Sequence, residues 1–251
     1  THKPEHLMLL LARASVRILN DNHAGATEDI NAADKQFKDH PLVLHYRGVL
    51  SFKEKKYSEA KSSFERVLSV NPDYLPTVLW AGLTDYALNN LEQASRFFAQ
   101  YVSAVPNATQ VEAFLAITRA RLGGKKGAAE LLAKLGAVDI NDPQSLVLIG
   151  QAHLLTGDQQ AGARYLARAI ERKPDLIDLR MNLVSALLQK GDKTEAIHHA
   201  EEALKKSPND PRANRVMIAA LLENGQADKA LEILKNFEKA MPDSPIPLIY
   251  R

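Results

Sequence analysis

The chain has 251 residues, of which 25% are charged and 45% hydrophobic, and its formal net charge is +2. This composition is typical of a folded chain with a sizeable core, and its dispersed charge lacks the basic stripe that a nucleic-acid partner requires. Cysteine is absent, which excludes disulfides and thiolate metal sites, and no apolar run is long enough to span a bilayer.

Taken in chain order, the sequence repeats itself every 34 residues, and each unit is expected to hold two helices. The predicted units are 7–40, 41–74, 75–108, 109–142, 143–176, 177–210 and 211–244, with residues 1–6 preceding them. One place in the second helix is always small: Ala26, Ala60, Ala94, Ala128, Gly162, Ala196 and Ala230. A place in the first helix is small in five units (Ala14, Gly48, Gly82, Ala116 and Gly150), whereas Val184 and Ile218 occupy it in the last two. Because closely packed helices need small side chains where their axes approach, the helix spacing in these two units is left open.

Turn and terminator residues recur in the same register. The turn between the two helices carries Asp21, Lys55, Asn89, Gly123, Gly157, Gly191 and Gly225, which are expected in the left-handed conformation, with mild strain at Lys55. The second helices are expected to stop before Pro72, Pro106, Pro174, Pro208 and Pro242. Asp142-Pro143, Asp210-Pro211 and Ser244-Pro245 are read as helix N-caps followed by proline.

This spacing and these residue types resemble the tetratricopeptide repeat over essentially the whole chain. Gly48, Tyr57, Ala60, Phe64 and Pro72 stand where that family has its signature residues. The resemblance implies an all-α fold, a right-handed superhelical solenoid of helix-turn-helix repeats spanning 1–251 as one domain. Residues 245–251 are interpreted as the start of a truncated further repeat, and the natural protein is expected to continue past Arg251.

In the tetratricopeptide family the first helix of each unit lines a concave groove that binds a protein or peptide. The groove places carry mostly apolar and aromatic residues in units two to four: His45, Tyr46, Phe52, Trp80, Leu83, Tyr86, Phe114 and Ile117. Aromatic side chains supply much of the binding energy at protein interfaces. The alternative, that such a stripe fills the core between helices, stays open, above all for Phe52 and Tyr86. We expect Trp80 to be partly exposed.

The same places turn polar in units five to seven: Gln144, Gln151, Asp178, Asn182, Ser185, Arg212 and Arg215. Arg212 and Arg215 lie three apart on one helix face and could bind a carboxylate of the partner, or could equally pair with acids nearby. The Lys, Asn and Arg pattern by which some of these repeats bind chaperone C-termini is missing.

The sequence offers no catalytic or metal constellation, and we expect no cofactor. The eight histidines do not converge, and zinc-protease, nucleophile-elbow and phosphate-loop motifs are absent. Gly123-Gly124-Lys125-Lys126-Gly127 resembles a phosphate loop only in composition and is interpreted as a plain turn.

A narrower resemblance covers about Asp34 to Leu135, including "HYRGVLSFKEKKYSEA" and "NPDYLPTVLWAGLTDYALNNLEQA". This stretch is similar to the PrsT-type tetratricopeptide lipoproteins of the PEP-CTERM/exosortase system of Gram-negative bacteria. It implies a non-catalytic scaffold for protein sorting or exopolysaccharide export, held at the periplasmic face of the outer membrane by a lipid anchor outside this segment. The alternatives are the substrate-recognition arm of an enzyme such as a glycosyltransferase, whose catalytic domain lies outside this segment, a cytoplasmic location, and self-association through the ends of the solenoid.

Overall fold

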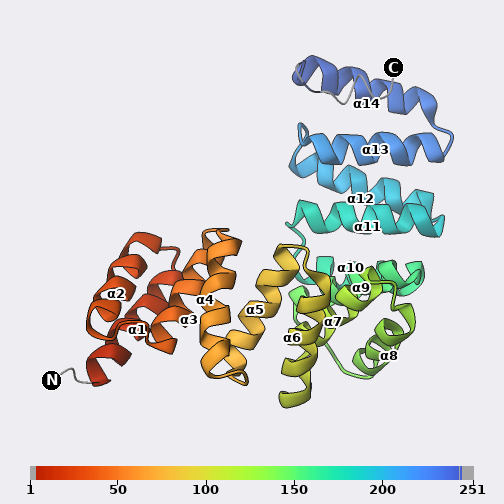
Figure 1. Cartoon of the computed structure of the whole chain (residues 1–251). Coiled ribbons are helices and arrows are strands. Elements are labelled where there is room, and N and C mark those ends of the chain that lie inside the picture. Colours follow the sequence, from red (N-terminus) through yellow and green to blue (C-terminus); the bar gives the residue numbers. More distant parts are fainter. Residues whose placement is uncertain (1–3, 243, 245–251) are drawn as a thin grey trace. The chain divides into compact units, whose positions relative to one another are not determined.

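The structure is a computed structural model that describes residues 4–242 and 244, and this part of the chain is all-α, with no strand (Figure 1). The predicted all-α repeat fold is confirmed. Seven helix pairs follow one another in the order α1 Pro4–Leu19 and α2 His23–Gln36, α3 Pro41–Lys53 and α4 Tyr57–Val70, α5 Leu75–Ala87 and α6 Leu91–Ala104, α7 Thr109–Arg121 and α8 Lys125–Gly136, α9 Pro143–Thr156 and α10 Gln159–Arg172, α11 Ile177–Lys190 and α12 Lys193–Lys206, and α13 Pro211–Glu223 and α14 Ala227–Ala240. The segment 245–251, interpreted above as the start of a further repeat, lies outside the described residues.

The chain forms two compact units, Thr1–Gly123 and Gly124–Arg251. Unit 1 contains α1 to α7 and unit 2 contains α8 to α14, so the boundary passes through the fourth predicted repeat. Within each unit, consecutive helices pack against one another and bury a continuous apolar core. The expectation that 1–251 is a single solenoid domain stays a prediction. No helix in 4–242 is long and apolar enough to cross a membrane.

A small residue facing a large one sets the closest approach within several hairpins. A methyl group added to Gly48 would lie 2.5 Å from the ring of the fully buried Phe64, and one added to Gly82 would lie 2.8 Å from Phe98. In α10 the same applies to Gly162, where an added methyl would lie 2.4 Å from Leu154. The glycines therefore fix how closely the two helices of a repeat can pack.

The sixth repeat, where Val184 interrupts the small-residue pattern, reverses the sizes. The residue 16 positions after the small one is Phe64 in the second repeat, whereas the corresponding residue after Val184 is Ala200. Val184 and Ala200 are both fully buried. A large residue on the first helix is thus matched by a small one on the second in this repeat, whereas the seventh repeat has two large buried residues at the same places, Ile218 and Leu234.

The turn inside each hairpin has the left-handed conformation that the sequence predicts. The residue at this place has a positive φ in all seven repeats: Asp21, Lys55, Asn89, Gly123, Gly157, Gly191 and Gly225. The helix stops are also as predicted, since α4, α6, α10, α12 and α14 each end two residues before a proline. Asp142 and Asp210 cap the N-termini of α9 and α13 through their carboxylates, each with proline in the first turn.

Gly48→Ala should destabilise the protein, because the new methyl must displace the buried Phe64 ring from its place between α3 and α4. Overpacking of this kind typically lowers the free energy of unfolding by about 1–3 kcal/mol. The matched control is Gly136→Ala in α8, where the nearest atom beyond the adjoining helix backbone would be the Tyr165 hydroxyl, 3.8 Å away. Chemical denaturation should show a loss only for Gly48→Ala, and equal stability of the two variants would contradict this account.

Lys55→Gly should stabilise the protein, because Lys55 has a φ of 61° and a side chain is unfavourable in that region by roughly 1 kcal/mol. The control is Lys53→Gly, which places glycine in the last turn of α3 and should destabilise by about 0.5–1 kcal/mol. Thermal unfolding should separate the two variants in opposite directions. A lower melting temperature for Lys55→Gly would show that the turn is not strained.

Candidate functional site

The first helices of unit 1 are joined by pairs of aromatic rings. Phe52 of α3 contacts Trp80 of α5 edge to face, with ring centroids 5.1 Å apart. The same two places, one repeat later, hold Tyr86 of α5 and Phe114 of α7, whose centroids lie 5.5 Å apart. Each pair therefore bridges consecutive first helices, and both use the preferred edge-to-face geometry.

We call Tyr46, Phe52, Trp80, Leu83, Tyr86 and Phe114 the first-helix aromatic surface. All six are half-buried, and Tyr46, Phe52 and Trp80 pack against the core of unit 1 while keeping part of their surface open. Trp80, the only tryptophan in the chain, is thus partly exposed, as expected. Arg121 lies over the Tyr86 ring, 5.4 Å from its centroid, which adds a cation to one end of this surface.

Two of the predicted groove residues are corrected by the structure, because they lie in the core. His45 is 6% exposed and Ile117 is 2% exposed, so neither can contact a partner in this conformation. His45 forms a 2.8 Å hydrogen bond with the hydroxyl of Thr77 at the start of α5, and Tyr74 approaches its ring edge-on. The fifth residue of this repeat therefore faces the next hairpin rather than the open surface.

His45 should make unit 1 sensitive to acid, because burial lowers the pKa of its imidazole from 6.5 to about 4. Between these values the unfolded chain binds more protons than the folded one, so the free energy of unfolding falls as the pH falls. At about 1.4 kcal/mol for each unit of pKa, the loss should reach roughly 2–3 kcal/mol near pH 4.

The measurement is a set of urea denaturation curves between pH 7 and pH 4 for the wild type and His45→Gln. His153 and His199, whose pKa values are also lowered by burial, are present in both proteins and cancel in the comparison. The variant should lose less stability on acidification. Parallel profiles would mean that His45 does not titrate in this range.

The polar residues predicted to line the groove in the fifth to seventh repeats, all within unit 2, do not gather into one site. Gln151 is half-buried, whereas Asn182, Arg212 and Arg215 are exposed. Arg212 forms ion pairs with Asp178 of the preceding first helix and with Asp210, its own helix cap. Local pairing, the alternative weighed from the sequence, therefore holds for Arg212.

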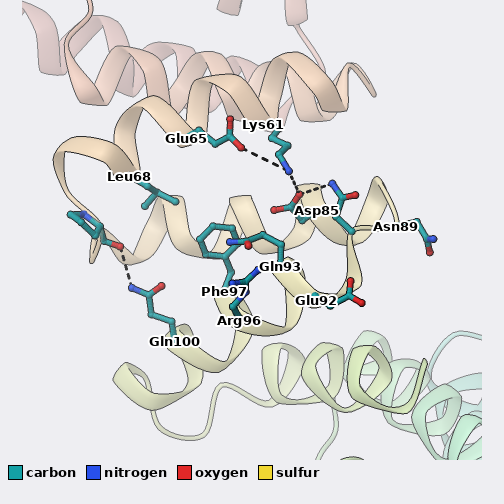
Figure 2. A pocket seen from close by; sticks show the side chains of 12 residues that line it. Lys61, Glu65, Leu68, Asp85, Asn89, Glu92, Gln93, Arg96, Phe97 and Gln100 are labelled. Carbon is teal, nitrogen blue, oxygen red and sulfur yellow. Dashed lines mark hydrogen bonds and ion pairs between the residues drawn. The ribbon is translucent and has the colours of Figure 1, made fainter. Parts of the chain in front are cut away.

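Unit 1 also has a pocket on its second-helix face that the sequence did not reveal (Figure 2). The cavity, of about 670 Å³, lies between α4 and α6 and is closed at one end by the turn between α5 and α6. Asp85, 2% exposed, accepts hydrogen bonds from Lys61 at 2.7 Å and from Asn90 at 2.9 Å. Glu65 approaches the same lysine at 3.8 Å. Figure 2 shows Lys61 reaching between the two carboxylates, so its charge is already neutralised within the protein.

This pocket could not be recognised from the sequence, because its lining comes from three separate segments. Lys61 and Glu65 read as an ordinary exposed pair on a helix, and Asp85 reads as a polar residue near a helix end. The one available signal is the 34-residue register, which brings α4, α6 and the turn between α5 and α6 together.

Comparison with known proteins agrees with the fold. No curated protein matches the chain. Among solved structures, a tetratricopeptide repeat protein from Parabacteroides merdae aligns with a TM-score of 0.68 at 15% identity, over 94% of this chain and 93% of its own. PilW, a type IV pilus biogenesis factor, aligns with a TM-score of 0.71 at 15% identity, over 84% of this chain and 97% of its own.

A third similar structure is the APC/C hetero-tetramer Cut9-Hcn1, with a TM-score of 0.67 and 17% identity over 87% of this chain. This chain spans only 43% of that one. At these identities the three likenesses show the fold alone. Tetratricopeptide repeat models match residues 51–117 and 187–246, and a further model of the same repeat matches 143–176. These matches cover more than half of the sequence, and the chain belongs to the tetratricopeptide repeat family.

Proposed function

We propose that this chain is a non-catalytic scaffold that binds a partner protein or peptide on the first-helix aromatic surface of unit 1. Tetratricopeptide repeats generally bind protein partners, and the family membership supports the scaffold role. The observation that supports binding on the first-helix aromatic surface is the half-buried state of Trp80. Its ring packs against Phe52, and part of it remains exposed to solvent.

The arrangement of the rings suits binding for an energetic reason. Phe52 and Trp80 hold each other edge to face, and Phe114 is stacked on the fully buried Phe98 with a centroid distance of 5.6 Å. Rings fixed in this way lose little conformational entropy when a partner covers them. Half-buried aromatic residues beside a core are the type of anchor that dominates the binding energy of protein interfaces.

The proposed setting is the cell envelope of a Gram-negative bacterium, in protein sorting or exopolysaccharide export. This part of the proposal is supported by the resemblance of residues 34–135 to the PEP-CTERM-type lipoproteins. A lipid anchor outside this segment would hold the scaffold at the membrane.

The proposal predicts that Trp80→Ala/Phe114→Ala loses a partner that the wild type captures from envelope extract. Removing two half-buried aromatic anchors typically weakens an interface by more than about 2 kcal/mol, which is a loss of roughly thirtyfold or more. The matched control is Tyr101→Ala, which removes a half-buried aromatic ring from the second helix α6. Identical capture by the wild type and the double variant would refute the surface and leave the fold intact.

Because Trp80 is the only tryptophan, its fluorescence reports on the same surface without any label. Acrylamide should quench it in the free protein, since the indole is partly exposed. Addition of the captured partner should lower the quenching constant by covering the ring. An unchanged quenching constant in the complex would place the partner elsewhere.

A further inference from the structure

Unit 2 has a second-helix pocket in the same register as the pocket of unit 1. Its cavity, of about 630 Å³, lies between α8 and α10 beside the last turn of α9. Arg164 and Tyr165 occupy the same places as Arg96 and Phe97, two repeats of 34 residues later in the chain. Arg96 and Phe97 line the pocket of unit 1, and Arg164 and Tyr165 line the pocket of unit 2. The same structural gap between neighbouring second helices therefore occurs in both units.

The charges of the two pockets are opposite. In unit 1 the acids Glu65, Asp85 and Glu92 outnumber the bases Lys61 and Arg96. In unit 2 the bases are Lys125, Lys126 and Arg164, and the only acid in the lining is Asp158. We call this second cavity the basic pocket. The two cavities thus share a register, and the variable residues decide which charge each attracts.

The bases of the basic pocket are left without a counter-charge. Across residues 4–242, no ion pair neutralises Lys125, Lys126 or Arg164, in contrast to Lys61 in unit 1. Asp158, the one acid, instead approaches His153 at 3.4 Å and caps the N-terminus of α10. Lys125 and Lys126 therefore remain available to a ligand, whereas Arg164 lies over the Tyr165 ring, 5.6 Å from its centroid.

Lys125 and Lys126 also stand where a helix disfavours positive charge. They open α8, whose first turn contains no acid and whose cap, Gly124, provides no side-chain hydrogen bond. The N-terminal end of a helix carries a partial positive charge, so two lysines there cost stability in the absence of an anion. An anion bound in the cavity would be attracted both by the lysines and by this helix end.

The walls of the cavity restrict the kind of anion. Ala129, Ala133 and Gly136 form one side, on α8, and leave room where unit 1 has Lys61, Glu65 and Leu68. The Tyr165 ring on the other side is only 5% exposed and is covered by the parallel His153 ring, at 5.4 Å between centroids. Because this ring has no open face, a nucleobase would find no stacking partner there. A carboxylate side chain needs only cations and space.

We propose that the basic pocket binds the carboxylate side chains of an acidic segment of a partner protein. The site lies on the second helices of unit 2, so it is separate from the first-helix aromatic surface of unit 1. The basic pocket would be a second point of attachment for a partner protein. It would favour a negatively charged segment, whereas the first-helix aromatic surface would favour an apolar one. The two proposed sites can be tested independently, because no residue is shared between them.

The test is fluorescence anisotropy of a labelled alternating Asp/Glu peptide titrated with the wild type, Lys125→Glu/Lys126→Glu and the control Lys229→Glu/Lys235→Glu. The control makes the same change of net charge on the exposed surface of α14. The pocket variant should bind at least tenfold more weakly, and the control should bind as the wild type does. Because glutamates suit the start of α8, the pocket variant should melt no lower than the wild type, so that unfolding cannot explain its loss.

Competition separates the possible anions. Glutarate should displace the peptide at a lower concentration than inorganic phosphate does, and phosphate acting first would overturn the carboxylate assignment. Failure of the wild type to bind the peptide, or equal weakening by the two charge variants, would overturn the site itself. Trp80→Ala/Phe114→Ala should still bind the peptide, which distinguishes this proposal from the function of the first-helix aromatic surface.

Discussion

The close approach of two helices within the repeats that lie inside one unit is the constraint on which the rest of this structure depends. At Gly48 and Gly82 there is no room for a methyl group, because Phe64 and Phe98 fill the space from the second helix. In the sixth repeat the sizes are exchanged, with Val184 opposite Ala200 in the register. The seventh repeat has a large buried residue at both places, Ile218 and Leu234, so the sizes at this contact vary between repeats while the hairpin is kept.

Other positions of the repeat differ in residue type from one repeat to the next. The 34-residue register decides which of these positions meet in space. The sixth and twelfth places of neighbouring first helices meet, which gives the Phe52–Trp80 and Tyr86–Phe114 pairs. The gap between neighbouring second helices recurs in the same manner and is acidic in unit 1 and basic in unit 2. One backbone pattern thus presents surfaces of different character along its length, which is what a scaffold for protein partners requires.

The features that depend on local conformation could be predicted from the sequence. Lys55 adopts a positive φ because its place in the repeat demands it, whatever the residue, and the proline stops act through the backbone alone. Burial was harder to predict, because it depends on the neighbouring hairpin. His45 occupies a place assigned to the groove, yet the start of the next first helix provides Thr77 as a partner and encloses it.

The pockets and the division of the chain were beyond sequence reasoning for a different reason. Lys61 and Asp85 are 24 residues apart, and nothing in either segment indicates that they pair. The boundary at Gly123 and Gly124 falls in a turn whose residues fit the 34-residue pattern as well as those of any other repeat. The turn itself therefore does not mark the boundary, although α8 ends early, at Gly136, and Ile140 stands where five other repeats have a proline.

Site-specific photo-crosslinking in envelope extract tests the central claim, that the first-helix aromatic surface is where a protein partner binds. A benzoylphenylalanine introduced in place of Trp80 lies on that surface, and one in place of Tyr101 lies on the second helix α6 at a similar degree of burial. The account predicts a discrete crosslinked partner from position 80 and none from position 101. Crosslinking from position 101 with none from position 80 would contradict it.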